Sequence, residues 1–308
     1  MPQGSARDGA ALLMQITANG VALEVDIQGP ASGRPLLMIM GLGMQLLAWP
    51  QGLVDLLVRS GFRVIRFDSR DIGLSQSFKT HGTPNLMLEW VRHGVGLSVR
   101  SPYALSDMAD DSAALLGALG LDSADICAAS MGGMVAQHLA ARHPERVRSL
   151  TLMMTTSGAR GLPGPSWKVR HAMLKRPPVH AGEPAQVRHL VQLFRLIGSP
   201  GYPAPPAGLE QRVTAALRRS QRPDGVLRQM VAILADGDRS AMLPAIAAPT
   251  QIIHGAADPL LPAACGRDLA ARINGAELDV IDGMGHDLPS ELWPRFAADI
   301  RSAAERAG

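Results

Sequence analysis

The segment 125–134 constrains the fold of this chain more than any other part of the sequence. It reads Asp-Ile-Cys-Ala-Ala-Ser-Met-Gly-Gly-Met, an apolar run typical of a buried strand that stops at a turn of small residues. Beyond the turn, an apolar pattern with helical spacing runs from Met131 to Arg142, and Pro144 ends it. The pattern predicts a strand, a sharp turn and a helix, with Ser130 at the turn.

A serine at such a turn has the surroundings that nucleophilic catalysis requires. Its hydroxyl is a poor nucleophile at neutral pH, so a histidine must take its proton and backbone N–H groups must bind the developing oxyanion. The motif G-x-S-x-G is matched with one departure, because Ala128 replaces the first glycine while Gly132 keeps the second. We expect a Cβ at position 128 to fit between strand and helix, and one at position 132 to clash. Ser130 is therefore the candidate nucleophile, on a variant elbow.

Two later segments supply an acid and a base in the order Ser, Asp, His. Residues 249–260 read as a buried parallel strand whose following loop carries Asp258. Residues 276–286 read as a second strand that ends in a Gly-flanked loop with His286. Taken alone, a loop Asp or His is usually structural or solvated, but loops at the carboxyl edge of a parallel sheet converge on one crevice. Their order and placement make Asp258 the candidate acid and His286 the candidate base.

An oxyanion hole needs two backbone N–H donors. One comes from the residue after the serine, here Met131, and the other from the loop after an early strand. Residues 34–44 fit that strand and its Gly-rich exit, which makes Leu42 the candidate second donor, with an ordinary glycine turn as the alternative. Met40-Gly41 stands where a His-Gly pair is common, and the chemistry is unchanged because the donor is backbone.

The remaining pattern predicts an α/β fold. Residues 12–29 read as two strands around Asn19-Gly20, a hairpin signal, and should form an antiparallel edge. Helical patterns separate most of the later strand-like runs, and this alternation predicts a mainly parallel sheet with right-handed crossovers. The later runs cover residues 35–40, 63–67, 124–129, 148–155, 249–254 and 277–281, which brings the sheet to eight strands.

Strand signals disappear between residues 158 and 244, where Pro and Gly clusters separate helical patterns. We expect residues 1–157 and 245–308 to form the core domain, and residues 158–244 to form a helical cap inserted after the sixth strand. The helices expected in the cap cover residues 183–197, 207–220 and 224–235.

The cap is expected to cover the catalytic crevice and to shape the substrate pocket. Residues 160–240 contain thirteen Arg or Lys and five Asp or Glu, which predicts a solvated basic face, with a site for an anionic substrate as the alternative. Several apolar residues are candidates for an adaptable pocket lining, with ordinary core packing as the alternative for each. They are Met153, Met154, Trp167, Met173, Leu193, Phe194, Leu196, Ile197 and Met230.

Composition excludes several other classes of protein. The 308 residues, 46% of them hydrophobic, suffice for one large domain with an inserted cap. The net charge of +3 is small and the positive residues form no dense run, which argues against nucleic-acid binding. No apolar run reaches about eighteen residues and no secretory signal is recognisable, so we expect no membrane span and a cytoplasmic location. Cys127 and Cys265 predict neither a disulfide framework nor a zinc site, and Cys127, inside a strand, should be inert.

Together these motifs resemble the α/β-hydrolase superfamily over nearly the whole chain. Besides the triad segments, residues 66–75, Arg-Phe-Asp-Ser-Arg-Asp-Ile-Gly-Leu-Ser, are similar to the family's D-x-R-G-x-G-x-S turn, with Asp71 where glycine is common. The loop 40–44, Trp49-Pro50 and this turn most resemble bacterial esterases of the aclacinomycin methylesterase type. The resemblance implies an α/β-hydrolase fold, with a mostly parallel eight-stranded sheet flanked by helices, and the hydrolysis of carboxylic esters.

The sequence therefore predicts a serine esterase that acts on a small to medium, largely apolar ester through an acyl-enzyme. No cofactor or metal is expected, because side chains and backbone donors serve every step. The expected partner is the small-molecule ester, and monomer or homodimer is left open. Alternatives are a C–C bond hydrolase, a lactonase or a cofactor-free peroxidase of the same fold, and a non-catalytic ligand-binding protein. A serine nucleophile argues against haloalkane dehalogenase and epoxide hydrolase, which use a carboxylate.

Overall fold

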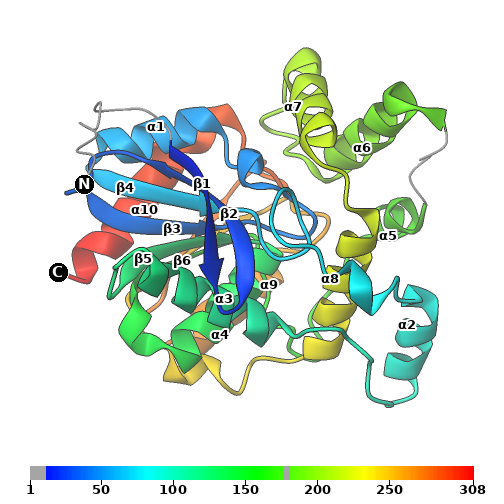
Figure 1. Ribbon diagram of the computed structural model, residues 1–308, viewed down its shortest axis with the longest axis horizontal. Coiled ribbons are helices and arrows are strands. Elements are labelled where there is room, and N and C mark those ends of the chain that lie inside the picture. Colours follow the sequence, from blue (N-terminus) through cyan, green and yellow to red (C-terminus); the bar gives the residue numbers. More distant parts are fainter. Residues whose placement is uncertain (1–11, 176–180) are drawn as a thin grey trace.

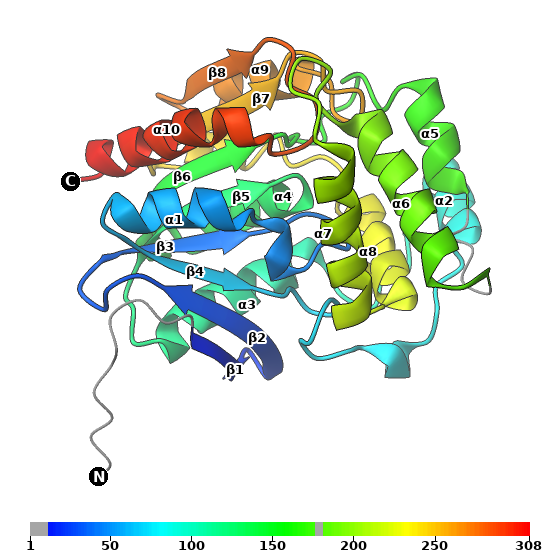
Figure 2. The ribbon, with the colours of Figure 1, turned by 90° about the horizontal axis from the view of Figure 1, so that it is seen from above.

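An eight-stranded sheet crosses the protein in the order β1-β2-β4-β3-β5-β6-β7-β8 (Figures 1 and 2). The computed structural model describes residues 12–175 and 181–308, so the first eleven residues of the expected core and residues 176–180 of the expected cap lie outside the described residues. β2 is antiparallel to β1 and to β4, and all other neighbouring strands are parallel, which confirms the predicted sheet. The strands are β1 Leu12–Ala18, β2 Val21–Gln28, β3 Arg34–Ile39, β4 Phe62–Phe67, β5 Ala124–Ala129, β6 Val147–Met153, β7 Thr250–Gly255 and β8 Glu277–Ile281.

The central strands are apolar on both faces because helices cover both. In β5, Ile126 and Ala128 belong to one cluster of buried side chains, whereas Cys127 and Ala129 belong to the other. Successive side chains of a strand point to opposite faces, so a strand covered on both sides reads as a continuous apolar run. This explains why the segment before Ser130 lacks the alternation of a half-exposed strand.

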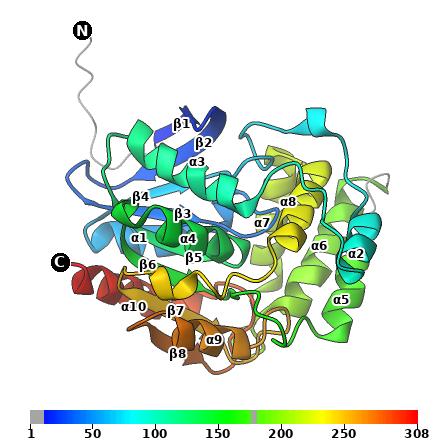
Figure 3. The same ribbon diagram turned by 90° about the horizontal axis from the view of Figure 1, so that it is seen from below.

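Helices α3, α4 and α9 cover one face of the sheet, and α1 and α10 cover the other (Figures 2 and 3). In α10, Phe296, Ile300 and Ala304 recur every four residues and are buried, while Arg301 and Glu305 are exposed. Burying a side chain such as Phe296 contributes about 1.5–3 kcal/mol. These helices are α1 Gln51–Arg59, α3 Leu105–Ala118, α4 Met131–Arg142, α9 Ala264–Arg272 and α10 Trp293–Arg306.

The N-terminal hairpin forms one edge of the sheet, as predicted. β1 and β2 are joined by the two residues Asn19 and Gly20, whose φ angles are +51° and +72°. A two-residue turn with positive φ at both positions matches the right-handed twist of the flanking strands, and Asn-Gly is the sequence that tolerates it best.

A second group of helices lies beyond the carboxyl ends of the strands (Figure 2). Four of these helices follow β6, namely α5 Trp167–Leu174, α6 Glu183–Ile197, α7 Pro206–Arg219 and α8 Pro223–Asp236. The last three agree with the predicted helices to within one residue at each end, whereas α5 was not predicted. A fifth, α2 Leu86–Gly94, precedes α3 in the chain but packs against α8.

Short 3-10 turns complete the described elements, at Leu46–Ala48, Lys79–His81, Pro144–Arg146, Leu243–Ala245 and Ser290–Leu292. Within residues 12–175 and 181–308, no helix combines the length and the apolar character that crossing a bilayer requires.

Candidate active site

Ser130 occupies a strained turn between β5 and α4. Its φ is +54° and its ψ is −121°, a conformation that residues other than glycine rarely adopt. Two hydrogen bonds with the chain at the end of β6 hold it: the Ser130 N–H donates to the Met153 carbonyl over 2.9 Å, and Thr155 Oγ1 donates to the Ser130 carbonyl over 2.7 Å. Such a turn projects the serine hydroxyl beyond the edge of the sheet, as the elbow motif requires.

The small residues near Ser130 are required by close backbone packing. A Cβ on Gly132 would lie 2.2 Å from the Ile39 carbonyl oxygen, and no rotamer change could relieve this contact because that oxygen belongs to the backbone. Ala128, by contrast, is fully buried and its methyl group packs in the core on the α3 and α4 side of the sheet. The expectation that position 128 accepts a Cβ and position 132 does not is confirmed.

The structure brings Ser130, His286 and Asp258 into one line of contacts. His286 Nε2 lies 3.0 Å from Ser130 Oγ, and His286 Nδ1 lies 2.7 Å from Asp258 Oδ2. Because an ionised carboxylate only accepts hydrogen bonds, we assign the proton to Nδ1, which leaves Nε2 to accept from the serine hydroxyl. The Asp258 side chain is fully buried and that of His286 is 8% exposed. The three residues follow β5, β7 and β8, so the predicted loops do converge at the carboxyl edge of the sheet.

Backbone donors and a second histidine surround the Asp258 carboxylate. Oδ1 accepts the N–H groups of Leu260 and Leu261 over 2.8 and 2.9 Å, which leaves Oδ2 for the base. His254, fully buried in β7, has its Nε2 2.7 Å from the Leu261 carbonyl oxygen and 3.9 Å from Asp258 Oδ2. Burial lowers the pKa of His254, so the neutral ring donates from Nε2 to that carbonyl. His254 therefore holds the turn on which Asp258 lies.

The loop that carries His286 is tied to the end of α6. The His286 N–H donates to the Ile197 carbonyl over 2.7 Å, and the Gly285 N–H donates to Ser199 Oγ over 2.8 Å. Ser199 Oγ in turn donates to Asp287, whose pKa is raised by burial. The position of the candidate base thus depends on α6 as well as on β8.

Of the two candidate oxyanion donors, Met131 follows Ser130 in the chain, and Leu42 follows Gly41, which lies against Ser130. Met131 is the first residue of α4, so its N–H has no acceptor within the helix. Gly41 precedes Leu42 and packs directly on the nucleophile, because a Cβ at Gly41 would lie 3.0 Å from the Ser130 Cβ. The loop after β3 therefore reaches the serine, as the sequence predicts.

Two glutamines connect the loop after β3 with α7 and α8. Gln229 of α8 is fully buried, its Oε1 accepts the Gly43 N–H over 2.9 Å, and its Nε2 donates to the Arg70 carbonyl over 3.1 Å. Gln45 Nε2 donates to the Ala216 carbonyl of α7 over 2.7 Å. The chain between β6 and β7 thus supports both the loop with Leu42 and the loop with His286.

A buried ion pair joins the turn after β4 to α8. Arg228 donates from Nε and Nη2 to the two oxygens of Asp71 over 2.8 Å each, and both side chains are at most 2% exposed. Burial by itself raises the pKa of Asp71, but hydrogen bonds from Arg228 and from the Phe78 N–H hold it below its usual value. Asp71 has a φ of +72°, where glycine is favoured, so the residue that departs from the family motif is also the one that binds α8.

Some of the residues considered as lining of the substrate pocket pack in the core or lie on the surface. Met153 and Met154 are buried in the core packed against α1 and α10. Trp167 is 74% exposed, so it lines no enclosed pocket, and its proposed role as lining is wrong. Cys127 and Cys265 are buried free thiols whose pKa values are raised by burial, which agrees with the inert packing role expected for Cys127.

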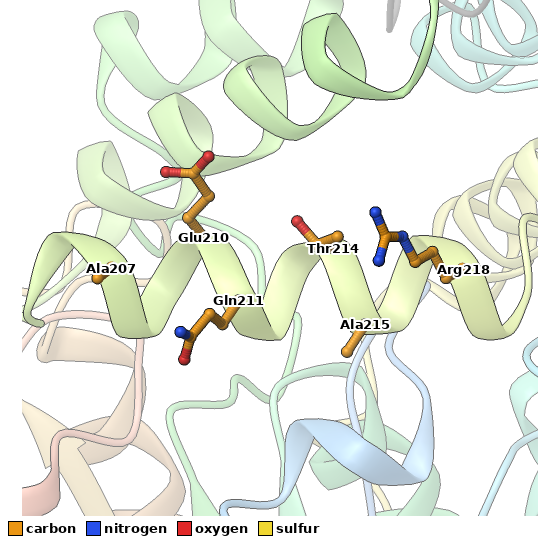
Figure 4. A pocket seen from close by; sticks show the side chains of 6 residues that line it. All are labelled: Ala207, Glu210, Gln211, Thr214, Ala215 and Arg218. Atoms are coloured by element: carbon orange, nitrogen blue, oxygen red, sulfur yellow. The ribbon is translucent and has the colours of Figure 1, made fainter.

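Within residues 12–175 and 181–308, no group of three or more His, Cys, Asp or Glu side chains could hold a metal ion. A surface hollow lies along α7, where Arg218 pairs with Glu183 of α6 over 2.8 Å (Figure 4). None of the candidate catalytic residues lines it. Its lining residues are Ala207, Glu210, Gln211, Thr214, Ala215 and Arg218.

His254, Ser199 and Gln229 were not identified from the sequence. His254 reads as part of an apolar strand, and Ser199 and Gln229 lie outside any motif. Ser199 and Gln229 act on residues close to the site through contacts between segments far apart in sequence, so no local pattern could mark them. The strand-end position of His254, four residues before Asp258, is the one signal that was available.

Comparisons with known proteins agree with the fold. A model of the alpha/beta hydrolase fold family matches residues 34–291. The chain is 28% identical over 305 residues to rhodomycin D methylesterase DnrP of Streptomyces peucetius, covering 92% of this chain and 95% of that protein. Both resemblances inferred from the motifs, to the superfamily and to bacterial methylesterases, are thereby confirmed.

Two further similarities extend the comparison. The chain is 30% identical over 309 residues to the 2-hydroxymuconate semialdehyde hydrolase of Pseudomonas sp. strain CF600, covering 96% of this chain and 94% of that protein. The solved structure of the meta-cleavage product hydrolase CumD from Pseudomonas fluorescens IP01 has a TM-score of 0.73 at 19% identity, covering 96% of this chain and 98% of that one. The second similarity concerns the fold alone.

Proposed function

This chain belongs to the alpha/beta hydrolase fold family, and on that premise we propose that it hydrolyses carboxylic esters through an acyl-enzyme on Ser130. Membership alone does not select a reaction, because one fold serves many. The observation that carries the proposal is the line of contacts from Ser130 Oγ through the His286 ring to Asp258. A hydroxyl, an imidazole and a buried carboxylate in this order are what acyl transfer to serine requires.

In the first half-reaction, Ser130 Oγ attacks the ester carbonyl carbon while His286 Nε2 takes the hydroxyl proton. Asp258 keeps the ring oriented and stabilises its charged form, and the N–H groups of Leu42 and Met131 bind the oxyanion of the tetrahedral intermediate. The bond between the carbonyl carbon and the alcohol oxygen then breaks. His286 gives its proton to that oxygen, and the alcohol leaves.

In the second half-reaction, water replaces the alcohol. His286 takes a proton from the water, whose oxygen attacks the acyl carbon, and the same two N–H groups bind the second oxyanion. When the bond to Ser130 Oγ breaks, the proton passes from His286 to the serine. The carboxylic acid leaves and the resting state is restored.

We further propose that residues 158–244 form a cap over this site and that α2 belongs to it. The hydrogen bonds of Ile197 and Ser199 to the His286 loop, and of Gln229 to the loop after β3, support this role. The similarity to a rhodomycin D methylesterase supports esters of small alcohols as substrates. We infer a small to medium, largely apolar ester.

A second candidate function is the hydrolysis of a C–C bond next to a carbonyl group. The 30% identity to a 2-hydroxymuconate semialdehyde hydrolase over nearly the whole chain favours it. The candidate triad is compatible with both reactions, so product analysis must separate them. Release of an alcohol and an acid from a simple ester, with no cleavage of a vinylogous diketone, would favour the esterase.

The first test is a fluorophosphonate probe, with the adduct located by mass spectrometry, beside turnover of p-nitrophenyl esters from acetate to palmitate. We expect labelling at Ser130, and Ser130→Ala and His286→Ala should each lower kcat by about 10³ or more without loss of folding. Ser290→Ala, which changes an exposed serine, is the matched control and should leave kcat unchanged. A Ser130→Ala variant that keeps more than about a tenth of the activity would contradict the assignment.

A further inference from the structure

An exposed apolar face lies on the outer side of the proposed cap. It comprises α2, the residues that follow it as far as position 100, and α5, and we call it the α2–α5 face. Figures 1 and 2 show both helices at the end of the molecule opposite the C-terminus, with α5 above α2 in Figure 1. Eleven large hydrophobic side chains are exposed within the described residues, and seven of them belong to this face. The seven are Met87, Leu88, Trp90, Val91, Val95, Leu97 and Trp167.

Helix α2 exposes its apolar side chains and buries its acidic one, which is the reverse of an ordinary surface helix. Met87 and Trp90 are each 63% exposed, whereas Glu89 is 5% exposed. Glu89 is held inside by Arg92, at 3.4 Å, and by the Arg100 N–H, which donates to it over 2.8 Å. A surface helix ordinarily buries its apolar side and exposes its charges, because water solvates charges and not apolar groups. The outer side of α2 is therefore suited to surroundings less polar than water.

The charges around this face have one sign. Residues 86–100 and 167–174 contain four Lys or Arg, and their one acidic residue is Glu89, which is buried in its ion pair. On α5, Lys168 and Arg170 are exposed close to Trp167. The face thus combines exposed aromatic and aliphatic side chains with an excess of positive charge, so its partner should be both apolar and anionic.

A second copy of this chain fits that description poorly. In a two-fold dimer this face would meet a second copy of itself, so two surfaces with an excess of positive charge would be brought together. An anionic lipid surface meets both requirements, because its headgroups attract Lys and Arg while Trp and Leu enter the boundary between headgroups and acyl chains. Trp suits this boundary, since it joins an apolar ring to a polar N–H group.

We propose that the α2–α5 face docks the protein on an anionic lipid bilayer, with the cap toward the lipid and the sheet away from it. The contact is peripheral and uses exposed side chains of two helices. It goes beyond the proposed function, because lipid binding requires none of the triad residues. For an esterase of apolar substrates, it places the cap next to the phase in which such esters dissolve.

The test is co-sedimentation of the full-length chain with vesicles. The vesicles contain phosphatidylcholine alone or with about 30 mol% phosphatidylglycerol, at roughly 50 and 500 mM salt. Wild type should bind the anionic vesicles at low salt at least about tenfold more strongly than the neutral ones, and less strongly at high salt. Trp90→Ser/Trp167→Ser and Lys168→Glu/Arg170→Glu should each lose at least about tenfold in binding. The matched control is Leu13→Ser, which removes a leucine that is 60% exposed on β1 and should bind as wild type does.

Three results would overturn the proposal. The first is wild type that does not sediment with anionic vesicles, and the second is binding that Leu13→Ser weakens as much as the double tryptophan variant does. The third is a wild-type dimer in light scattering that Trp90→Ser/Trp167→Ser converts to monomer, because the face would then belong to a second copy. Thermal melts by circular dichroism confirm that each variant folds. Vesicle binding by a chain that turns over no ester would contradict the proposed function and leave the docking surface standing.

Discussion

Gly132→Ala tests whether the elbow depends on the close approach of two backbone segments. The added Cβ would lie 2.2 Å from the Ile39 carbonyl oxygen, 2.7 Å from the Ile39 carbonyl carbon and 2.8 Å from the Met40 carbonyl oxygen. Ordinary van der Waals contact begins at 3.4 Å. Either α4 or the end of β3 must therefore move by about 1 Å, and these segments carry Ser130 and the loop with Leu42.

The magnitude follows from that displacement. A misplacement of about 1 Å at the reacting groups costs on the order of 10² in rate, so kcat for a p-nitrophenyl ester should fall roughly a hundredfold. Overpacking of this kind also costs about 1–3 kcal/mol of the unfolding free energy, which urea denaturation measures without reference to activity.

The matched control is Gly117→Ala in α3. A Cβ there meets only Arg146 Nη2, at 4.0 Å, so alanine should leave kcat unchanged and stabilise the helix by up to about 1 kcal/mol. The reasoning is refuted if Gly132→Ala keeps both kcat and the urea midpoint of wild type. A loss of stability without a loss of kcat would show that the strain is absorbed away from Ser130.

Two further predictions concern buried charge. Arg228→Met should lower the unfolding free energy by about 3–5 kcal/mol, because it leaves the buried Asp71 carboxylate unpaired. Adding Asp71→Gly should restore most of this loss by removing both the charge and the positive-φ strain, and a double variant with the urea midpoint of Arg228→Met would contradict this account. Burial and the nearby Asp279 raise the pKa of Asp299 to about 7, so its folded pKa lies above its unfolded one and wild type loses stability as the pH rises from about 4 through 7. Asp299→Asn should melt like wild type near pH 4 and at a higher temperature at pH 8, and an equal gain at both pH values would rule out this cause.

The parts of the fold that follow from local pattern could be predicted. The Asn19-Gly20 hairpin needs only two residues that accept positive φ, and the continuous apolar run of β5 needs only helices on both faces of the sheet. The candidate triad could be predicted for a similar reason. Ser130, Asp258 and His286 each follow a strand of one parallel sheet, and the carboxyl ends of such strands meet at one edge.

Contacts of the helices between β6 and β7 with the rest of the protein could not be predicted. Gln229 and Gly43 are 186 residues apart, and Arg228 and Asp71 are 157 apart, so no local pattern links the members of either pair. The burial of Glu89 and the exposure of Trp90 reverse the usual orientation of an amphipathic helix, which the sequence pattern alone does not reveal.

The sequence by itself determined the strand and helix pattern, the order of the candidate triad and the small residues of the turn at Ser130. These depend on the period of apolar residues and on backbone geometry, which neighbouring residues encode. Only the tertiary structure decided which residues between β6 and β7 support the loops of Leu42 and His286, and which apolar side chains stay exposed. The packing of helices distant in sequence places those side chains, and a side chain becomes a hydrogen-bond partner or an exposed surface only once its surroundings are assembled.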